Sequence, residues 1–325
     1  MTDHAIRFDQ LGGPEVLRYE TVDVPGPGEG EVRLRQTAIG VNLIDTYYRS
    51  GLYSTTLPSG LGVEAAGTVE AVGPGVSELA AGDRVAYCLG TLGGYATART
   101  YPAARLVRLP ADVGDEAAAA ALLKGLTAWY LIRRLRPLRP GETILVHAAA
   151  GGVGTILAQW AHHLGARVIG VVGSSAKAEI ARAFGADEVI LSGHEEVPAR
   201  VRAMTDGRGV PVVYDSVGRD TFEASLDSLA RFGLLVSFGN ASGPAPAVTP
   251  LTLMARGSVF LTRPLLNHYI EERADLEAGA RELFELIASG AIRPLIGQRV
   301  PLAEAAAAHA MLERRATSGA TILLP

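Results

Sequence analysis

The hydrophobic pattern of the chain changes before its middle. Residues 1–120 contain short runs in which apolar and polar residues alternate, such as EVRLRQTAIGV, GTVEAVG and GDRVAYC, and turn residues bound each run. Alternation with a period of two between frequent glycines and prolines predicts β-strands. We therefore expect a twisted, largely antiparallel β domain at the start of the chain.

From Glu142 onward, short apolar runs alternate with helical segments. TILVHAA, RVIGVV, EVI, VVYDSV and LLVSFG are the apolar runs, and GTILAQWAHHLG and AKAEIARAFG are two of the helical segments. Apolar strands that alternate with helices indicate a parallel sheet covered on both faces. The predicted fold class is α/β, with a β-rich domain over 1–124 and 263–325 and a doubly wound parallel-sheet domain over 125–262.

A long helix is predicted where the two patterns meet. The stretch DEAAAAALLKGLTAWYLIRRL has acidic residues in its first turn and arginines near its end, which is the charge order that the helix dipole favours. Pro137 follows, so the helix is expected to end before it.

Composition and charge narrow the classes of function. With 325 residues, the chain is long enough for two domains. A net charge of −4 and an isoelectric point near 6.0 give no electrostatic reason to expect nucleic acid or an anionic membrane as a partner. No apolar run is long enough to span a bilayer, and the first residues lack the apolar core of a signal peptide. We therefore expect a cytoplasmic protein.

The sequence has one cysteine, Cys88, which follows the strand-like run DRVAY. A single cysteine excludes internal disulfides and zinc sites built from several cysteines. We interpret Cys88 as a packed thiol and not as a nucleophile.

A glycine-rich turn follows the predicted strand ILVH. Against the pattern G-x-G-x-x-G, the small positions are Ala149, Gly151 and Gly154, with Gly152 and Val153 between the last two. Gly151 would let backbone N–H groups approach a pyrophosphate, and Gly154 would let the following helix pack closely on the sheet. The N-terminus of that helix would face the phosphate charge. The turn predicts a dinucleotide-binding site.

The end of the next strand indicates which dinucleotide binds. NAD sites place Asp or Glu there to accept hydrogen bonds from the ribose 2′-OH. Here Gly173, Ser174 and Ser175 occupy that place, and Lys177 follows. These residues offer hydrogen-bond donors and a positive charge, which suit a 2′-phosphate, so we predict NADPH. Alternatively, Lys177 is an ordinary solvated lysine.

Together these motifs resemble the medium-chain dehydrogenase/reductase superfamily, and within it the NADPH:quinone oxidoreductases related to zeta-crystallin. The matching stretches cover nearly the whole chain in order: GGPEVL, GVNLIDTYYRSGLY, LPSGLGVEAAGTVEAVGPGV, GDRVAY, LLKGLTAWYLIRR, VHAAAGGVG, VVYDSVGRDTF, VSFGNASG and LTRPLL. The resemblance implies a GroES-like catalytic domain, a Rossmann domain with the cofactor in the cleft between the two, and a homodimer formed through the Rossmann domains.

The resemblance also implies site residues. It assigns Asn42, Asp45, Tyr47 and Tyr53 to the substrate and nicotinamide cleft as catalytic positions, and Asn42 also to the cofactor. Ser192 stands where the family often has a tyrosine that contacts the adenosine. Besides the glycine turn and the loop at 173–177, the implied cofactor-binding positions are Lys124, Thr127, Tyr130, Ser192, Val217, Phe238, Gly239, Asn240 and Arg315.

Several of these residues also have a purely structural interpretation. Tyr47 and Tyr53 could be packed aromatics, Asn42 a turn residue, and Lys124 and Arg315 solvated side chains. His147, at a predicted strand end, is interpreted as a core histidine with a hydrogen-bond partner and not as a catalyst.

The zinc enzymes of the superfamily need an early cysteine and a His-Glu pair. Here the pair reads Val63-Glu64 and no cysteine is nearby, so no metal site is predicted and Glu64 is expected to have a structural or hydrogen-bonding role. Without a Lewis acid the acceptor must already be electrophilic. This favours a quinone and leaves an α,β-unsaturated ketone or aldehyde as the alternative. Tyr47, Tyr53 or water could supply the proton.

A different class of function is a non-catalytic NADPH-binding protein, either crystallin-like or RNA-binding. A local basic run could contact RNA, but we interpret it as the solvated end of a helix. The run consists of Arg133, Arg134, Arg136 and Arg139.

Overall fold

The computed structural model describes residues 2–325, and the chain divides into two compact units. Unit 1 comprises Met1–Leu126 and Glu271–Pro325, and unit 2 comprises Thr127–Ile270. The predicted α/β class with one β-rich part and one parallel-sheet part is confirmed. The limits expected for the two domains, 1–124 with 263–325 and 125–262, stay a prediction.

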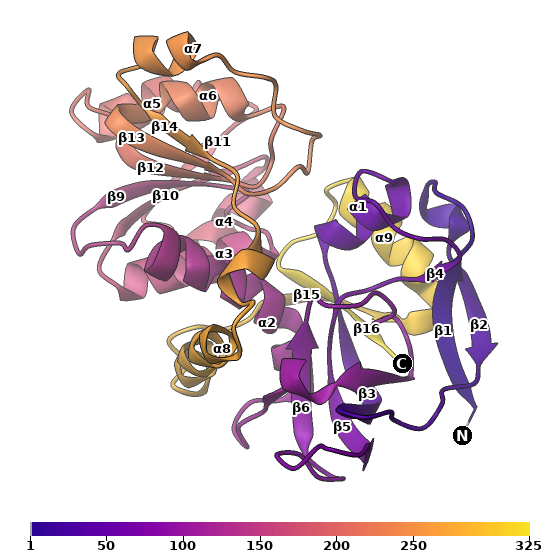
Figure 1. Cartoon of the computed structure of the whole chain (residues 1–325). Coiled ribbons are helices and arrows are strands. Elements are labelled where there is room, and N and C mark those ends of the chain that lie inside the picture. The colour runs from indigo at the N-terminus through magenta and orange to yellow at the C-terminus, as the bar shows by residue number, and fades with distance from the viewer. Residues whose placement is uncertain (1) are drawn as a thin grey trace. The chain divides into compact units, whose positions relative to one another are not determined.

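Unit 1 is built on a mostly antiparallel sheet, in which only the pair β15–β16 is parallel among the described strands. Its C-terminal strand lies beside its longest early strand, with Ile322 opposite Gly40 (Figure 1). The return of the C-terminal part to the first domain is thereby confirmed. The strand order is β15 (Ile296–Pro301), β16 (Ala320–Leu324), β3 (Glu31–Val41), β5 (Glu64–Val72), β6 (Arg84–Cys88) and β8 (Val107–Arg108), and β7 (Ala98–Pro102) also pairs with β3.

A smaller antiparallel sheet holds the N-terminal strand of unit 1. Its order is β2 (Arg18–Val22), β1 (Asp3–Phe8) and β4 (Ser59–Gly60). Ile6 and Phe8 of β1 are buried in the same apolar cluster as Leu34 of β3. The helices that lie wholly in this unit are α1 (Leu43–Ser50), α8 (Arg273–Ala288) and α9 (Ala305–Glu313), with short 3₁₀ turns at Pro14–Val16, Ala103–Arg105 and Leu302–Glu304.

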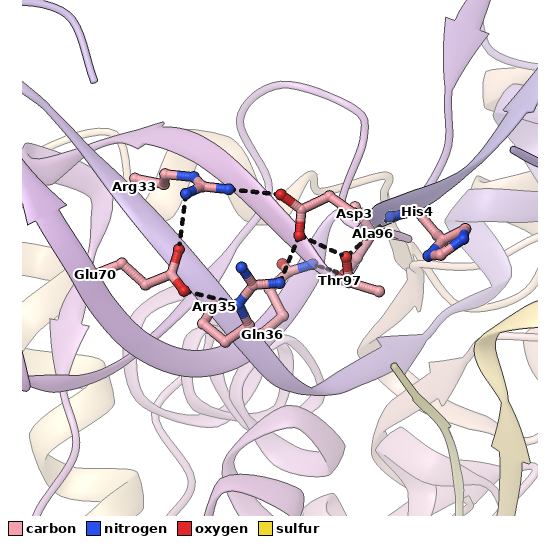
Figure 2. A network of polar contacts seen from close by, with 8 residues as sticks. All are labelled: Asp3, His4, Arg33, Arg35, Gln36, Glu70, Ala96 and Thr97. Carbon is pink, nitrogen blue, oxygen red and sulfur yellow. Dashed lines mark hydrogen bonds and ion pairs between the residues drawn. The ribbon is translucent and has the colours of Figure 1, made fainter. Parts of the chain in front are cut away.

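An ion-pair network fastens β1 to the main sheet (Figure 2). Asp3 accepts hydrogen bonds from Arg33 and Arg35 of β3, each at 2.5 Å. Glu70 of β5 accepts from Arg35 at 2.8 Å and lies 3.3 Å from Arg33. The two arginines lie on one face of β3 because residues two apart in a strand share a face. Two carboxylates from neighbouring strands therefore neutralise two guanidinium groups.

Unit 2 is built on a parallel sheet whose strand order is that of dinucleotide-binding proteins. The strands run β11 (Glu188–Leu191), β10 (Arg167–Val172), β9 (Thr143–His147), β12 (Val210–Asp215), β13 (Leu229–Ser237) and β14 (Phe260–Thr262). Counted along the chain, this is the order 3-2-1-4-5-6 of a dinucleotide-binding sheet. The order reverses between β9 and β12, so ligands are expected beyond the carboxyl ends of these two strands.

Helices cover both faces of this sheet, as predicted. Figure 1 shows α3 on one face and α5 and α6 on the other. Gly165 and Gly185, past the ends of the first two helices, have φ of 79° and 97°, which favours glycine there. The helices are α3 (Gly152–His163), α4 (Ser175–Ala183), α5 (Val197–Met204), α6 (Phe222–Asp227) and α7 (Pro250–Ala255), and a 3₁₀ turn spans Leu266–Tyr269.

The long predicted helix is present as α2 (Asp115–Trp129), which passes from unit 1 into unit 2. Its continuation over Tyr130–Leu135 is a π-helix, which the sequence pattern did not predict. Within residues 2–325, no helix is both long enough and apolar enough to cross a bilayer. Cys88 is buried, and burial raises the pKa of its thiol, which agrees with a packed cysteine.

Candidate active site

The centre of the candidate site in unit 1 is a buried ion pair. Lys124 of α2 donates from Nζ to Glu64 Oε2 at 3.1 Å and to Asn42 Oδ1 at 2.8 Å. Asn42 in turn donates from Nδ2 to Glu64 Oε2 at 2.8 Å. All three side chains are buried, so Lys124 is not a solvated lysine. The predicted residues Asn42 and Lys124 are thus brought together by a glutamate that was not among the predicted site residues.

Both carboxylate oxygens of Glu64 accept hydrogen bonds from other residues of the protein. Oε1 accepts a 2.6 Å hydrogen bond from the backbone N–H of Leu123, while Oε2 faces Asn42 and Lys124. The expected hydrogen-bonding role of Glu64 is confirmed. Among residues 2–325, no group of three or more His, Cys, Asp or Glu side chains is arranged to hold a metal ion.

The first turn of α1 fixes Asn42. The backbone N–H of Asn42 donates to Asp45 Oδ2 at 2.8 Å, so Asp45 satisfies a donor that the start of a helix leaves free. The side chain of Asn42 is therefore available for Glu64 and Lys124. Asp45 is fully buried, and burial raises its pKa to about 7 in spite of its hydrogen bonds.

The two predicted tyrosines lie side by side after this turn. The rings of Tyr47 and Tyr53 meet edge to face with centroids 5.3 Å apart, and Tyr48 contacts Tyr53 in the same manner at 5.8 Å. Tyr47 is buried and Tyr53 is half-buried. Gly51 makes this approach possible because it ends α1 with φ of 84°.

The glycine turn of unit 2 leads directly from β9 into α3. A side chain at Gly154 would place its Cβ 2.2 Å from the backbone oxygen of Ala148, so only glycine fits without backbone movement. Gly151 is the N-cap of α3, and Gly152 and Val153 form its first turn. Within this turn Ala148 has a positive φ of 52°. The free N–H groups at this helix start can face an anion.

The predicted 2′-phosphate loop lies at the end of β10. Ser174 is the N-cap of α4, and its Oγ accepts the backbone N–H of Lys177 at 3.4 Å. Gly173, Ser174 and Ser175 are exposed, and Lys177 is half-buried. Ser192 follows β11 and donates from its backbone N–H to Val172 at 3.0 Å, so it lies next to this loop.

An aspartate that sequence reasoning missed organises the end of β12. Asp215 Oδ1 accepts the backbone N–H of Val217 at 2.8 Å, and Oδ2 accepts the hydroxyls of Thr221 and Ser225, both at 2.7 Å. Because Ser225 donates to Asp215, its 3.0 Å contact with His147 Nε2 is one in which the histidine donates. Burial lowers the pKa of His147. The prediction of a core histidine is confirmed, and Ser225 is not arranged as a nucleophile.

The loop after β13 lies beside this aspartate. Phe238 donates its backbone N–H to Asp215 O at 2.8 Å, and a Cβ at Gly239 would lie 2.3 Å from Ser216 O. With its amide oriented to suit its neighbours, Asn240 donates to Gly239 O at 3.0 Å and accepts from Arg263 at 3.2 Å. Val217, Phe238, Gly239 and Asn240 are thus gathered at the carboxyl ends of β12 and β13.

The remaining predicted residues lie elsewhere. Thr127 and Tyr130 are buried in unit 2, where Tyr130 stacks on Tyr269 with centroids 4.5 Å apart. Arg315 is exposed in unit 1, just past α9, with φ of 55°. The cofactor contacts of these three residues stay a prediction.

Known proteins resemble both units. The family model described as alcohol dehydrogenase GroES-like domain matches residues 28–111, and the one described as zinc-binding dehydrogenase matches 152–279. Quinone oxidoreductase of Pseudomonas aeruginosa is 54% identical over 98% of this chain and 99% of its own. 2-Haloacrylate reductase of a Burkholderia species is 44% identical over 97% of this chain and 96% of its own.

A solved structure agrees with these relatives. The crystal structure of Escherichia coli quinone oxidoreductase complexed with NADPH has a TM-score of 0.97 and 49% identity, covering 99% of this chain and 100% of that one. Similarity of this extent covers both units from end to end. The chain therefore belongs to the quinone oxidoreductase family of the medium-chain dehydrogenase/reductase superfamily.

Proposed function

We propose that this protein is an NADPH-dependent, zinc-independent reductase of quinones. The observation that carries the choice of NADPH is the end of β10, where Ser174 and Lys177 stand in place of a carboxylate. The oxygen of Ser174 accepts the Lys177 N–H, which leaves the serine O–H to donate to a phosphate. The solved NADPH complex of a relative with 49% identity supports the same cofactor.

The cofactor-binding role of each predicted residue is part of this proposal. The pyrophosphate would lie at the start of α3, where Gly154 allows close packing and Gly151 and Gly152 present backbone N–H groups. The 2′-phosphate would lie at Gly173, Ser174, Ser175 and Lys177, near Ser192. The remaining proposed contacts are Asn42, Lys124, Thr127, Tyr130, Val217, Phe238, Gly239, Asn240 and Arg315.

When bound, NADPH supplies the hydride, and the protein supplies the environment. The pair Lys124–Glu64 holds the amide of Asn42 in one orientation, which would give a bound nicotinamide a fixed polar neighbour. Tyr47 and Tyr53 would present aromatic surface to a planar acceptor, and either hydroxyl, or water, would deliver the proton.

Zinc independence is supported by the donor set around Glu64. The carboxylate faces the Lys124 ammonium and two N–H donors, so a positive charge already neutralises it. The preceding residue is Val63, which offers no ligand atom. A metal at this place would have to displace Lys124, so we expect chelators to leave the activity unchanged.

The alternative acceptor is an activated double bond. The observation that favours it is the 44% identity to 2-haloacrylate reductase over nearly the full length of both chains. A quinone and an α,β-unsaturated carbonyl both accept a hydride without a Lewis acid. The two acceptors therefore have to be compared directly.

The test is NADPH oxidation with a para-quinone, an ortho-quinone, a short alkenal and 2-chloroacrylate, each repeated with NADH and with a chelator. We expect turnover of the quinones with NADPH that the chelator does not change. Tight NADPH binding without turnover of any acceptor would favour the non-catalytic binding protein instead.

A pair of variants tests the cofactor loop. Lys177→Ala is expected to weaken NADPH binding about ten- to a hundredfold, because a charge-assisted contact is lost, and to leave NADH binding nearly unchanged. Arg182→Ala, also on α4 but paired with Glu179, is the matched control and should change neither. Equal losses for both cofactors in Lys177→Ala would contradict the 2′-phosphate assignment.

We also propose a homodimer formed through unit 2. β14 is at the edge of the sheet among the described strands, and four large apolar side chains of β13, α7 and β14 are each more than half exposed: Phe232, Leu251, Met254 and Phe260. An uncovered edge strand beside an apolar patch is a ready surface for a second sheet. We expect Phe260→Lys to give monomers in analytical ultracentrifugation. The control Leu52→Lys changes an exposed leucine of unit 1 and should leave the mass as in the wild type.

A further inference from the structure

A chain of buried polar side chains in unit 1 leads from α9 to Asp45. Arg49 of α1 is buried, pairs with Glu313, and donates from Nε to Gly12 O at 3.0 Å. Its Nη1 lies 3.1 Å from Nδ1 of His309, a fully buried histidine of α9. On its other side, His309 Nε2 lies 3.0 Å from the hydroxyl of Tyr95. Tyr95 OH lies 2.9 Å from Asp45 Oδ2.

Arg49 determines which group donates and which accepts in each hydrogen bond of this row of buried side chains. A guanidinium group can only donate, so His309 Nδ1 has to accept and carries no proton. Burial and the charge of Arg49 lower the pKa of His309 to about 3, which keeps the ring neutral. The ring N–H is therefore on Nε2 and donates to Tyr95. Because the tyrosine oxygen accepts this bond, its single hydrogen points to Asp45.

The two carboxyl oxygens of Asp45 differ in their hydrogen bonds. Oδ2 accepts both Tyr95 O–H and the Asn42 backbone N–H. Oδ1 is buried and has no hydrogen-bond partner within the part of the chain that the structure describes. A buried carboxylate with an unpaired oxygen is costly because its charge is desolvated, and a proton on the carboxyl group removes that charge. Since Oδ2 already faces two donors, a proton on Asp45 belongs on Oδ1.

We propose that Arg49, His309 and Tyr95 are positioning residues: they point the Tyr95 hydrogen at Asp45 Oδ2, so that the proton of the buried carboxyl group has to lie on Oδ1, and they thereby keep the Asn42 site in its reactive arrangement. The link between Asp45 and catalysis rests on the proposed function. The charged or titratable groups around Asp45 are Tyr95, Glu64 and Lys124, together with Tyr48 and Tyr87, whose pKa values the charge of Asp45 helps to raise. With Asp45 neutral, the Lys124–Glu64 pair is balanced. Loss of the proton would put a second carboxylate beside Asn42 with no further cation, so we expect the reduction rate to fall as pH rises past about 7.

The direct test is infrared difference spectroscopy of the full chain against pH, which detects the C=O band of a protonated carboxyl group. We expect a band that disappears with a midpoint near pH 7 and is missing in Asp45→Asn. Tyr95→Phe removes a donor to the ionised form, so its midpoint should rise by about one pH unit. No such band in the wild type, or an unmoved midpoint in Tyr95→Phe, would overturn the proposal.

Two further variants separate positioning from general loss of structure. Tyr87 is also a fully buried tyrosine of unit 1, but its hydroxyl donates to Gln36 at 2.5 Å. Tyr87→Phe should leave the Asp45 midpoint unchanged, and an equal shift in it would count against the proposal. His309→Gln keeps an acceptor for Arg49 and a donor for Tyr95, so it should keep the midpoint if the direction of the chain is what matters.

A kinetic measurement completes the test. The rate constant kcat for quinone reduction should fall as pH rises, with the same midpoint as the infrared band. In Tyr95→Phe, both midpoints should shift to higher pH by the same amount. A flat profile in an active enzyme would overturn the link to the reaction. Absence of turnover with every acceptor would instead count against the proposed function, and the infrared midpoints would still decide the position of the proton.

Discussion

The candidate site residues of the two units are held by different kinds of contact. In unit 2, the turn from β9 to α3 and the loop before α4 offer mainly backbone N–H groups, and glycines give them room. In unit 1, the ion pair of Lys124 and Glu64 joins side chains from three elements in a buried cluster with Asn42. A backbone site tolerates substitution wherever no Cβ intrudes, whereas a buried ion pair depends on both of its charges.

The largest expected effect is on the buried pair. Lys124→Met leaves Glu64 charged and unpaired in the interior, so the free energy of unfolding should fall by about 3–5 kcal/mol. Denaturant unfolding followed by circular dichroism measures it. The matched control is Lys177→Met on α4, which should change stability by less than about 0.5 kcal/mol. If the double variant Lys124→Met/Glu64→Leu is no more stable than Lys124→Met, the unpaired charge is not the cause.

The next effect tests the backbone site. Gly154→Val would put a side chain against the backbone of Ala148 and Ala149, so we expect a loss of about 1–3 kcal/mol and loss of NADPH binding. Gly26→Ala is the control, because no atom lies within 4 Å of its added Cβ and Gly26 is not a proposed cofactor contact. Calorimetric titration with NADPH compares the two. Tight binding by Gly154→Val would show that close packing of α3 is not required.

A smaller effect is expected at Asp3, which is buried but pairs with two partly exposed arginines of unit 1. Burial raises the pKa of Asp3, but hydrogen bonds from Arg35 and Thr97 and the charges of both arginines outweigh it, and the net pKa is lowered. A lowered native pKa adds stability above the pKa of an unfolded aspartate, and this stability is lost as pH falls through the native value. Asp3→Asn should lower the free energy of unfolding by about 1–2 kcal/mol at pH 7. In thermal unfolding measured at several pH values, the melting temperature of this variant should fall less steeply toward acid pH than that of the wild type. Asp9→Asn, at an exposed pair with Arg18, should leave this fall unchanged.

The smallest effect concerns the helix cap of unit 2. Ser174→Ala removes the oxygen that accepts the Lys177 N–H, so we expect a loss of about 0.5–1 kcal/mol. Ser175→Ala, one residue later and inside α4, should cost less. Chemical denaturation resolves the two. A larger loss for Ser175→Ala would place the start of the helix elsewhere.

The backbone site could be predicted because its determinants are local in the chain. The pattern from β9 to Gly154 spans one strand, one turn and one helix start, and the serine cap lies next to the residues that it caps. The alternation of strands and helices likewise predicted the parallel sheet. The pattern did not indicate the positive φ of Ala148, which adopts a conformation that glycine usually provides.

The side-chain cluster could be predicted only in part. A resemblance pointed to Asn42 and Lys124, but Glu64 is 60 residues from Lys124, and nothing in the sequence near either residue shows that they pair. The contact of Tyr95 with His309 spans 214 residues and depends on how α9 packs. Asp215 had a local signal, an acid at the end of the strand VVYD, which could have indicated a turn-capping role. Long-range pairing of side chains is set by tertiary packing, which a local pattern does not contain.

The buried position of Cys88 has a consequence for the durability of the protein. Quinones are electrophiles that attach covalently to thiolates, and a thiol that stays protonated and out of solvent reacts slowly. Cys88 is the only cysteine in the sequence, it is buried, and burial raises the pKa of its thiol. Under the proposed function, the protein would therefore present no accessible thiol that a quinone could arylate.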